Sequence, residues 1–153
     1  MENKNLLEIK NLRTYFYIRD HVAKAVDDVS LSIQSGQTLG LVGESGCGKS
    51  VTAHSIIQLI PVPPGKIEGG QIFFEGKNLL EFPESKMRKI RGNRISMIFQ
   101  EPMTSLNPVF PVGDQVAEVI RLHQRISRGE TRRRVIEMFQ LVGIPAAEAR
   151  LSD

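Results

Sequence analysis

One eight-residue segment constrains this chain more than any other part of its sequence. Residues 43–50 read GESGCGKS and match the phosphate-binding pattern G-x-x-x-x-G-K-[ST]. The short apolar run at 38–42 before the pattern predicts a buried strand of a parallel sheet, and residues 50–60 after it carry helical spacing until Pro61. A strand, a glycine-rich loop and a helix in this order direct backbone N–H groups and the positive helix end at one anionic group.

The residue types within the segment suit a nucleotide. Glycines at 43, 46 and 48 allow backbone angles that a Cβ would forbid and a close approach to phosphate oxygens. Lys49 adds a positive charge toward the β and γ phosphates, and Ser50 offers a hydroxyl to Mg²⁺, which prefers oxygen ligands. We therefore expect ATP and Mg²⁺ as ligands. The candidate nucleotide-binding residues in the segment are Gly43, Ser45, Gly46, Cys47, Gly48, Lys49, Ser50 and Val51, with Ser50 also a metal ligand.

Cys47 allows two interpretations. Its position beside Lys49 and the helix end favours a reactive, alkylatable thiol, whereas its small size suits a side chain that only fills space. We favour the second interpretation. It is the only cysteine of the 153 residues, which excludes an internal disulfide and agrees with a reducing compartment.

The remaining pattern predicts β and α/β material followed by helices. A glycine turn after the strand at 70–76 indicates a β hairpin arm. The expected strands, besides 38–42, cover residues 6–17, 23–33, 70–76 and 95–99, and the expected helices cover 50–60, 84–90, 112–125 and 131–142. The fold class that follows is α/β.

Composition argues against several kinds of partner. The formal net charge is only +3, and the basic residues between 121 and 134 lack the interleaved aromatic residues typical of nucleic-acid binding. We expect no nucleic-acid partner. The start has no secretory signal pattern, and no stretch approaches the roughly 20 apolar residues of a membrane helix. We therefore expect a cytoplasmic protein that does not insert into a membrane directly.

Three segments together resemble the nucleotide-binding domain of ABC transporters, in particular importers of dipeptides, oligopeptides and nickel. They are LVGESGCGKS at 41–50, PPGKIEGGQI at 63–72 and MIFQEPMTSLNP at 97–108, and the resemblance covers the whole chain. It implies a P-loop NTPase core with an antiparallel β arm and the start of a helical subdomain. Within this partial domain, 1–100 would form the arm and core, and 101–153 the beginning of the helical part.

The resemblance adds two site residues. Phe16 is similar in position to the aromatic residue that stacks on adenine, although a strand residue of this type is more often part of a core. Gln100 matches the glutamine whose side-chain oxygen approaches Mg²⁺ or the attacking water, so it is a candidate catalytic residue and metal ligand. An isolated glutamine after a strand would otherwise be a surface residue.

The resemblance also implies partners and a location. Membrane permease subunits would dock on residues 100–111 and the following helix, and a second ATP-binding subunit would complete a dimer. The subunit would then lie on the inner face of the cell membrane. The family's signature segment and catalytic glutamate are not among these residues, so we expect the chain alone to be inactive as an ATPase. Strands that pair beside 38–42 are also not among them, so we expect Leu39 and Leu41 to lack neighbours.

Two other functions remain open at this point. One is a non-catalytic nucleotide-binding remnant or decoy, which the absence of ATP turnover would support. The other is a soluble P-loop kinase or GTPase, against which the residues PMTSLNP at 102–108 argue.

Overall fold

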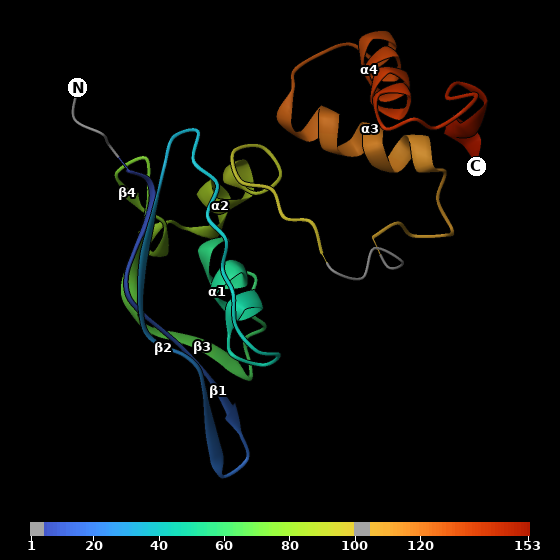
Figure 1. Ribbon diagram of the computed structural model, residues 1–153. Helices are drawn as coiled ribbons and strands as arrows, with labels where there is room; N and C mark the ends of the chain where they lie inside the picture. Colours follow the sequence, from blue (N-terminus) through green and yellow to red (C-terminus); the bar gives the residue numbers. More distant parts are fainter. Residues whose placement is uncertain (1–4, 100–104) are drawn as a thin grey trace. The chain divides into compact units, whose positions relative to one another are not determined.

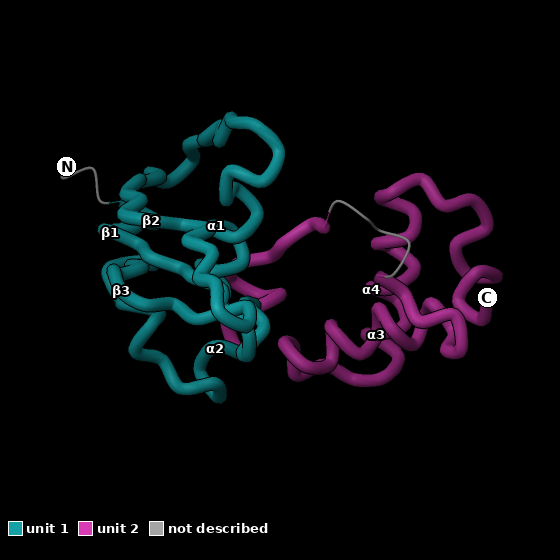
Figure 2. Tube along the Cα trace, turned by 90° about the horizontal axis from the view of Figure 1, so that it is seen from below, with its two compact units in different colours: residues 1–88 teal, residues 89–153 magenta. Residues whose placement is uncertain are grey.

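The computed structural model describes residues 5–99 and 105–153. The chain divides into two compact units, Met1–Arg88 and Lys89–Asp153, which are coloured separately in Figure 2. Among the described residues, no helix combines the length and apolar content needed to cross a membrane.

The first unit is built on a four-stranded antiparallel sheet in the order β2-β1-β3-β4 (Figure 1). The strands are β1 (Asn5–Ile18), β2 (His21–Gln34), β3 (Gly65–Phe74) and β4 (Lys77–Asn78). In the central strand, Ile9 lies between Leu31 of β2 and Ile72 of β3. The buried residues of β1 are Leu7 and Ile9 and then Leu12 and Thr14, so the alternation expected of a strand with one covered face shifts by one residue at an irregularity between Ile9 and Leu12.

The strands expected at 6–17 and 23–33 are confirmed as β1 and β2. The strand expected at 70–76 begins earlier, at Gly65, because Phe16 and its neighbours in β1 pair with residues 65–67. Strands β2, β1 and β3 lie side by side with β1 in the centre, and together they form the predicted antiparallel arm.

Helix α1 (Lys49–Ile56) packs against this sheet. The hydroxyls of Ser55 and Thr14 lie 2.9 Å apart, and both residues are fully buried. The predicted helix 50–60 begins one residue earlier and ends at Ile56, and a turn at 57–58 and two residues without regular structure separate it from Pro61. Beyond the sheet follow η1 (Leu79–Glu81) and α2 (Glu84–Ile90), and the latter has the predicted bounds.

Two expected strands are wrong. Residues 37–44 and 96–99 form no regular structure, and Ile95 makes only an isolated bridge with Arg91. Val42 is 94 % exposed and Ile98 is 97 % exposed. A parallel strand is stable only beside another strand, and the sheet of the described residues contains no neighbour for either segment.

The second unit is helical. It contains α3 (Val112–His123), α4 (Arg128–Leu141) and η3 (Ala149–Ser152). Its core consists of Ile120, Val135, Phe139 and Ala147. The helices expected at 112–125 and 131–142 are confirmed. The second begins three residues earlier because the Ser127 hydroxyl accepts a hydrogen bond from the Glu130 backbone N–H at 3.2 Å and caps the helix.

Candidate functional site

The GESGCGKS segment forms a loop that leads directly into α1. Gly46 and Gly48 have φ angles of 83° and 91°, in the left-handed region that favours glycine. A Cβ on Gly48 would lie 2.1 Å from the carbonyl oxygen of Ala25 in β2, so the loop touches the sheet backbone here. Glycine at this position therefore permits both the turn and the close packing of loop on strand.

Lys49 is the first residue of α1, and its ammonium group lies across the loop. Its Nζ donates hydrogen bonds to the carbonyl oxygens of Gly43 at 2.7 Å and Glu44 at 2.6 Å, and to Cys47 Sγ at 3.4 Å. A full positive charge is thus held against the backbone of the glycine loop. An anionic acceptor binds an ammonium group more strongly than a neutral carbonyl does, so it can replace the Gly43 and Glu44 carbonyls as the partner of Lys49.

The first turns of α1 attach this charge to the core of the unit. Thr52 is buried and bonds to the Gly48 carbonyl through both its backbone N–H, at 2.8 Å, and its hydroxyl, at 3.0 Å. The Ser55 hydroxyl donates to the carbonyl of Val51 at 2.7 Å and meets Thr14 of β1. Ser50 is exposed beside Lys49. The helix start is therefore fixed to the sheet. Of the residues expected to meet a ligand here, Ser50 is exposed, Lys49 and Val51 are half-buried and Gly48 is buried.

Cys47 is an exposed free thiol that lies over Gly43. A Cβ on Gly43 would approach Cys47 Sγ to 2.6 Å, so glycine leaves the room that the thiol occupies. The Cys47 side chain packs against Gly43 within the loop, which suits the interpretation that it fills space, and its thiol is also exposed to solvent. Ser45 is exposed on the same loop.

The loop fits the phosphate groups of a nucleotide. Gly46 and Gly48 add no side chains to the loop, the ammonium of Lys49 lies across it, and the start of α1 adds its positive end. The hydroxyl of Ser50 is the oxygen donor that Mg²⁺ chemistry requires next to the phosphates. The arrangement can bind and orient a polyphosphate.

Phe16 lies in β1, between Ala23 of β2 and Gly65 of β3, and is half-buried. A Cβ on Gly65 would come within 2.9 Å of its ring, so one edge of the ring packs over that glycine. The other two aromatic residues of this strand form pairs with carboxylates. The Tyr15 hydroxyl donates to Asp27 at 2.6 Å, and the Tyr17 hydroxyl donates to Glu68.

These hydrogen bonds shift the pKa values of the tyrosines and carboxylates that they join. The hydrogen bond from Tyr15 lowers the pKa of Asp27, and the same bond raises the pKa of Tyr15. The hydrogen bond from Tyr17, followed by that from Lys66, lowers the pKa of Glu68. The pairs link β1 to β2 and β3, next to Phe16.

The predicted catalytic residue Gln100 lies outside the described residues. Downstream of it, Leu106, Val109 and Phe110 are 46 %, 80 % and 58 % exposed. The sequence analysis selected this apolar loop but missed Gln115, whose side chain forms hydrogen bonds with the backbone of Asn107 and Phe110. The available signal was the Asn107-Pro108 turn beside a polar residue in the first turn of a helix.

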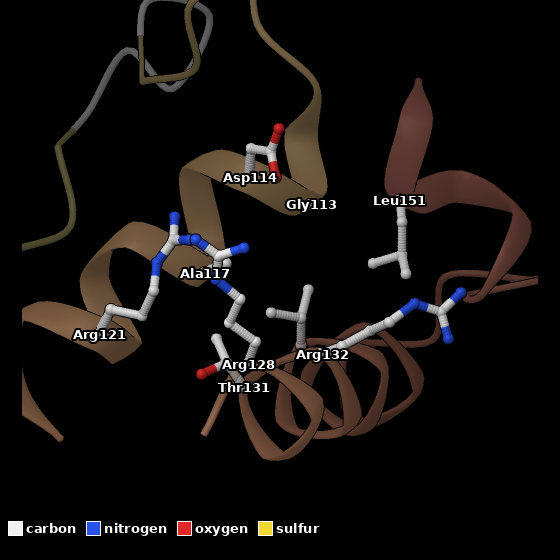
Figure 3. Close-up of a pocket in the computed structure, with 9 residues that line it drawn as sticks. Gly113, Asp114, Ala117, Arg121, Arg128, Thr131, Arg132 and Leu151 are labelled. Carbon is white, nitrogen blue, oxygen red and sulfur yellow. The ribbon is translucent and has the colours of Figure 1, made fainter. Parts of the chain in front are cut away.

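A separate cleft of about 450 Å³ lies within the second unit, between α3, α4 and η3 (Figure 3). Arginines 121, 128 and 132 line it together with Asp114 and the buried Val135. Arg132 also pairs with Glu148 at 2.7 Å. These exposed arginines give the cleft a positive character but do not belong to the glycine loop of the first unit.

Comparison with known proteins identifies the family of the chain. The ABC transporter family matches residues 26–153. The probable peptide ABC transporter ATP-binding protein y4tR of Sinorhizobium fredii is 51 % identical over 97 % of this chain and 44 % of its own length. The oligopeptide transport ATP-binding proteins OppD and AppD of Bacillus subtilis are 46 % and 50 % identical, each over 97 % of this chain and over 41 % and 45 % of their lengths.

Among solved structures, the dimeric MJ0796 bacterial ABC transporter cassette is similar with a TM-score of 0.80 and 22 % identity, over 96 % of this chain and 60 % of the cassette. The fold is thus a P-loop NTPase core with an antiparallel β arm and the start of a helical subdomain. The chain belongs to the ABC transporter family, and the resemblance drawn from the sequence is confirmed. It spans less than half the length of the curated relatives named above.

Proposed function

We propose that this chain carries the ATP-binding, energy-coupling site of an ABC importer for peptides and binds Mg-ATP through residues 43–50. The observation that carries the proposal is the Lys49 ammonium held across a loop of left-handed glycines at the start of α1. The MJ0796 cassette, which shares this fold, has also been solved with ADP and Pi. Peptide is the proposed cargo because the relatives are named as peptide or oligopeptide transport proteins.

Each candidate residue has a distinct proposed part. The loop N–H groups and Lys49 hold the phosphates, and the Ser50 hydroxyl contributes to the Mg²⁺ site. Phe16 stacks on the adenine ring, and Gln100 orients the metal or the attacking water. Bound Mg²⁺ would neutralise charge on the phosphates during hydrolysis. Lys49 would give up its bonds to the Gly43 and Glu44 carbonyls when it meets phosphate oxygens.

Isothermal titration of Mg-ATP into the chain and into Lys49→Ala tests the proposal. Charged hydrogen bonds contribute roughly 1.5–3 kcal/mol, so we expect affinity to fall by about ten- to a hundred-fold. Lys77→Ala, which removes an exposed lysine of β4, is the matched control and should bind like the unmodified chain. Equal affinities for Lys49→Ala and the unmodified chain would show that the loop does not hold nucleotide in this way.

The proposed partners are a membrane permease and a second ATP-binding subunit. Residues 100–111 and α3 are the proposed permease contact, because the loop ahead of α3 exposes Leu106, Val109 and Phe110. The dimeric state of the MJ0796 cassette supports pairing with a second subunit. Such an assembly would place the subunit on the cytoplasmic face of the membrane without inserting into it.

A further inference from the structure

The loop ahead of α3 is folded into a defined turn. The Phe110 N–H donates to the Asn107 carbonyl at 3.2 Å, which closes a four-residue turn. The Asn107 side-chain oxygen accepts from the Val109 N–H at 3.0 Å. Both bonds are exposed to water, where a turn of this kind is only weakly stable by itself.

The side chain of Gln115 binds both ends of this turn. Its Oε1 accepts from the Asn107 N–H at 2.8 Å, and its Nε2 donates to the carbonyls of Asn107 at 2.9 Å and Phe110 at 2.8 Å. One amide thus satisfies three backbone groups of a turn that it does not belong to. Gln115 itself is half-buried in the first turn of α3, so its backbone position is set by the helix.

The three hydrogen bonds of the Gln115 amide, called the clamp below, attach the ends of the turn to α3. With its ends held on α3, the turn exposes Val109 and Phe110. A groove of about 620 Å³ lies beside the turn, and its lining residues are Asn107, Phe110, Asp114, Gln115, Glu118 and Arg121. The apolar residues and the groove therefore form one surface whose shape depends on the Gln115 amide.

We propose that Gln115 is a positioning residue that holds the turn at 107–110 in the form a permease segment recognises. The inference rests on the proposed permease contact and deepens it, because it names the group that gives the contact surface its shape. A rigid, preformed turn costs less ordering on association than a flexible one. Gln115 contributes to docking through the turn and does not need to touch the permease.

The first experiment measures the clamp without a partner. Amide hydrogen exchange is compared in the unmodified chain, in Gln115→Met, which keeps the side-chain length but loses all three bonds, and in Gln140→Met, a matched change at an exposed glutamine of α4. We expect exchange at Asn107 to become about five- to ten-fold faster in Gln115→Met and to stay unchanged in the control. Mg-ATP affinity should be equal in all three proteins. Unchanged exchange at Asn107 in Gln115→Met would overturn the inference.

The second experiment uses the full-length subunit assembled with its permease, with Cys47→Ala and Val109→Cys in every sample. Crosslinking from position 109 to the permease should fall about five-fold when Gln115→Met is added, and not with Gln140→Met. Faster exchange with undiminished crosslinking would show that the clamp exists but does not position the contact. If position 109 never reaches the permease, while cysteines elsewhere in the complex do, the proposed permease contact itself is wrong, and the exchange result identifies which proposal failed.

Discussion

At the residue scale, Gly48 shows how one position of the loop meets two constraints at once. Its φ of 91° strains any residue with a Cβ, and its Cβ site is filled by the Ala25 carbonyl oxygen at 2.1 Å. Gly36 has a comparable φ of 75°, but nothing lies within 4 Å of its Cβ site. The two glycines therefore separate the cost of the backbone conformation from the cost of contact.

Gly48→Ala should lower the free energy of unfolding by more than Gly36→Ala. The left-handed conformation alone costs about 1–2 kcal/mol for a residue with a Cβ, and the contact with the β2 backbone should add about 1 kcal/mol or more. Urea denaturation of both variants measures the difference. Equal losses would mean that the loop moves away from Ala25 without cost.

The sequence predicted the backbone of the loop at two of its three glycines, since Gly46 and Gly48 have positive φ angles and Gly43 does not, while the roles of the loop residues in binding stay predictions. Glycines 46 and 48 stand where the φ angle is positive, and Lys49 stands where a charge can reach the whole loop. Gln115 could not be predicted in the same way. Its bonds go to backbone groups five and eight residues away, and although the Asn107-Pro108 turn ahead of a helix is a signal, it does not tell which polar residue of the helix bonds to the turn.

At the element scale, the β arm should be sensitive to acid. Asp27 and Glu68 are held by Tyr15 and Tyr17, and the pKa of each carboxyl is lowered in the folded chain. Their stabilisation is fully present above the ordinary pKa of about 4 and is lost as pH falls through the lower, folded pKa. The pKa values of both tyrosines are raised, so their stabilisation is present below about pH 10 and is lost as pH rises through the folded pKa.

Combining Asp27→Asn with Glu68→Gln should flatten the dependence of stability on acidic pH. The urea midpoint, followed by circular dichroism from pH 7 to pH 2.5, is the measurement. Asp20→Asn, in the exposed turn between β1 and β2, is the control and should keep the acidic loss of the unmodified chain. An unaltered pH profile in the double variant would show that these two pairs do not link the strands energetically.

Elements with their own local signals were predicted well. The helix at 84–90 has the expected bounds, and Ser127 shifts the start of α4 by a cap that a closer reading of the sequence could locate. The runs at 38–42 and 95–99 were wrong for the opposite reason. An apolar run indicates that a segment can be buried, but the segment forms a strand only when another strand pairs with it. The sheet of the described residues contains no strand that pairs with either run.

At the scale of the whole molecule, the absence of a strand at 38–42 in the described sheet leaves apolar side chains exposed. Leu39, Leu41 and Val42 are 42 %, 48 % and 94 % exposed, in a segment with no regular structure. Their backbone N–H and C=O groups can also pair with another chain, as at an open sheet edge. The expectation that Leu39 and Leu41 lack neighbours agrees with this exposure.

We therefore expect the 153-residue chain to self-associate through residues 37–44 as its concentration rises. Val42→Lys places a charge in the most exposed apolar position of the segment and should weaken association, because edge lysines oppose strand pairing. Val119→Lys is the matched control, since Val119 is 50 % exposed on helix α3 and does not lie at a sheet edge. Sedimentation velocity over a range of concentrations distinguishes the variants. A chain that stays monomeric throughout, or Val42→Lys associating as strongly as the control, would show that this segment does not drive association.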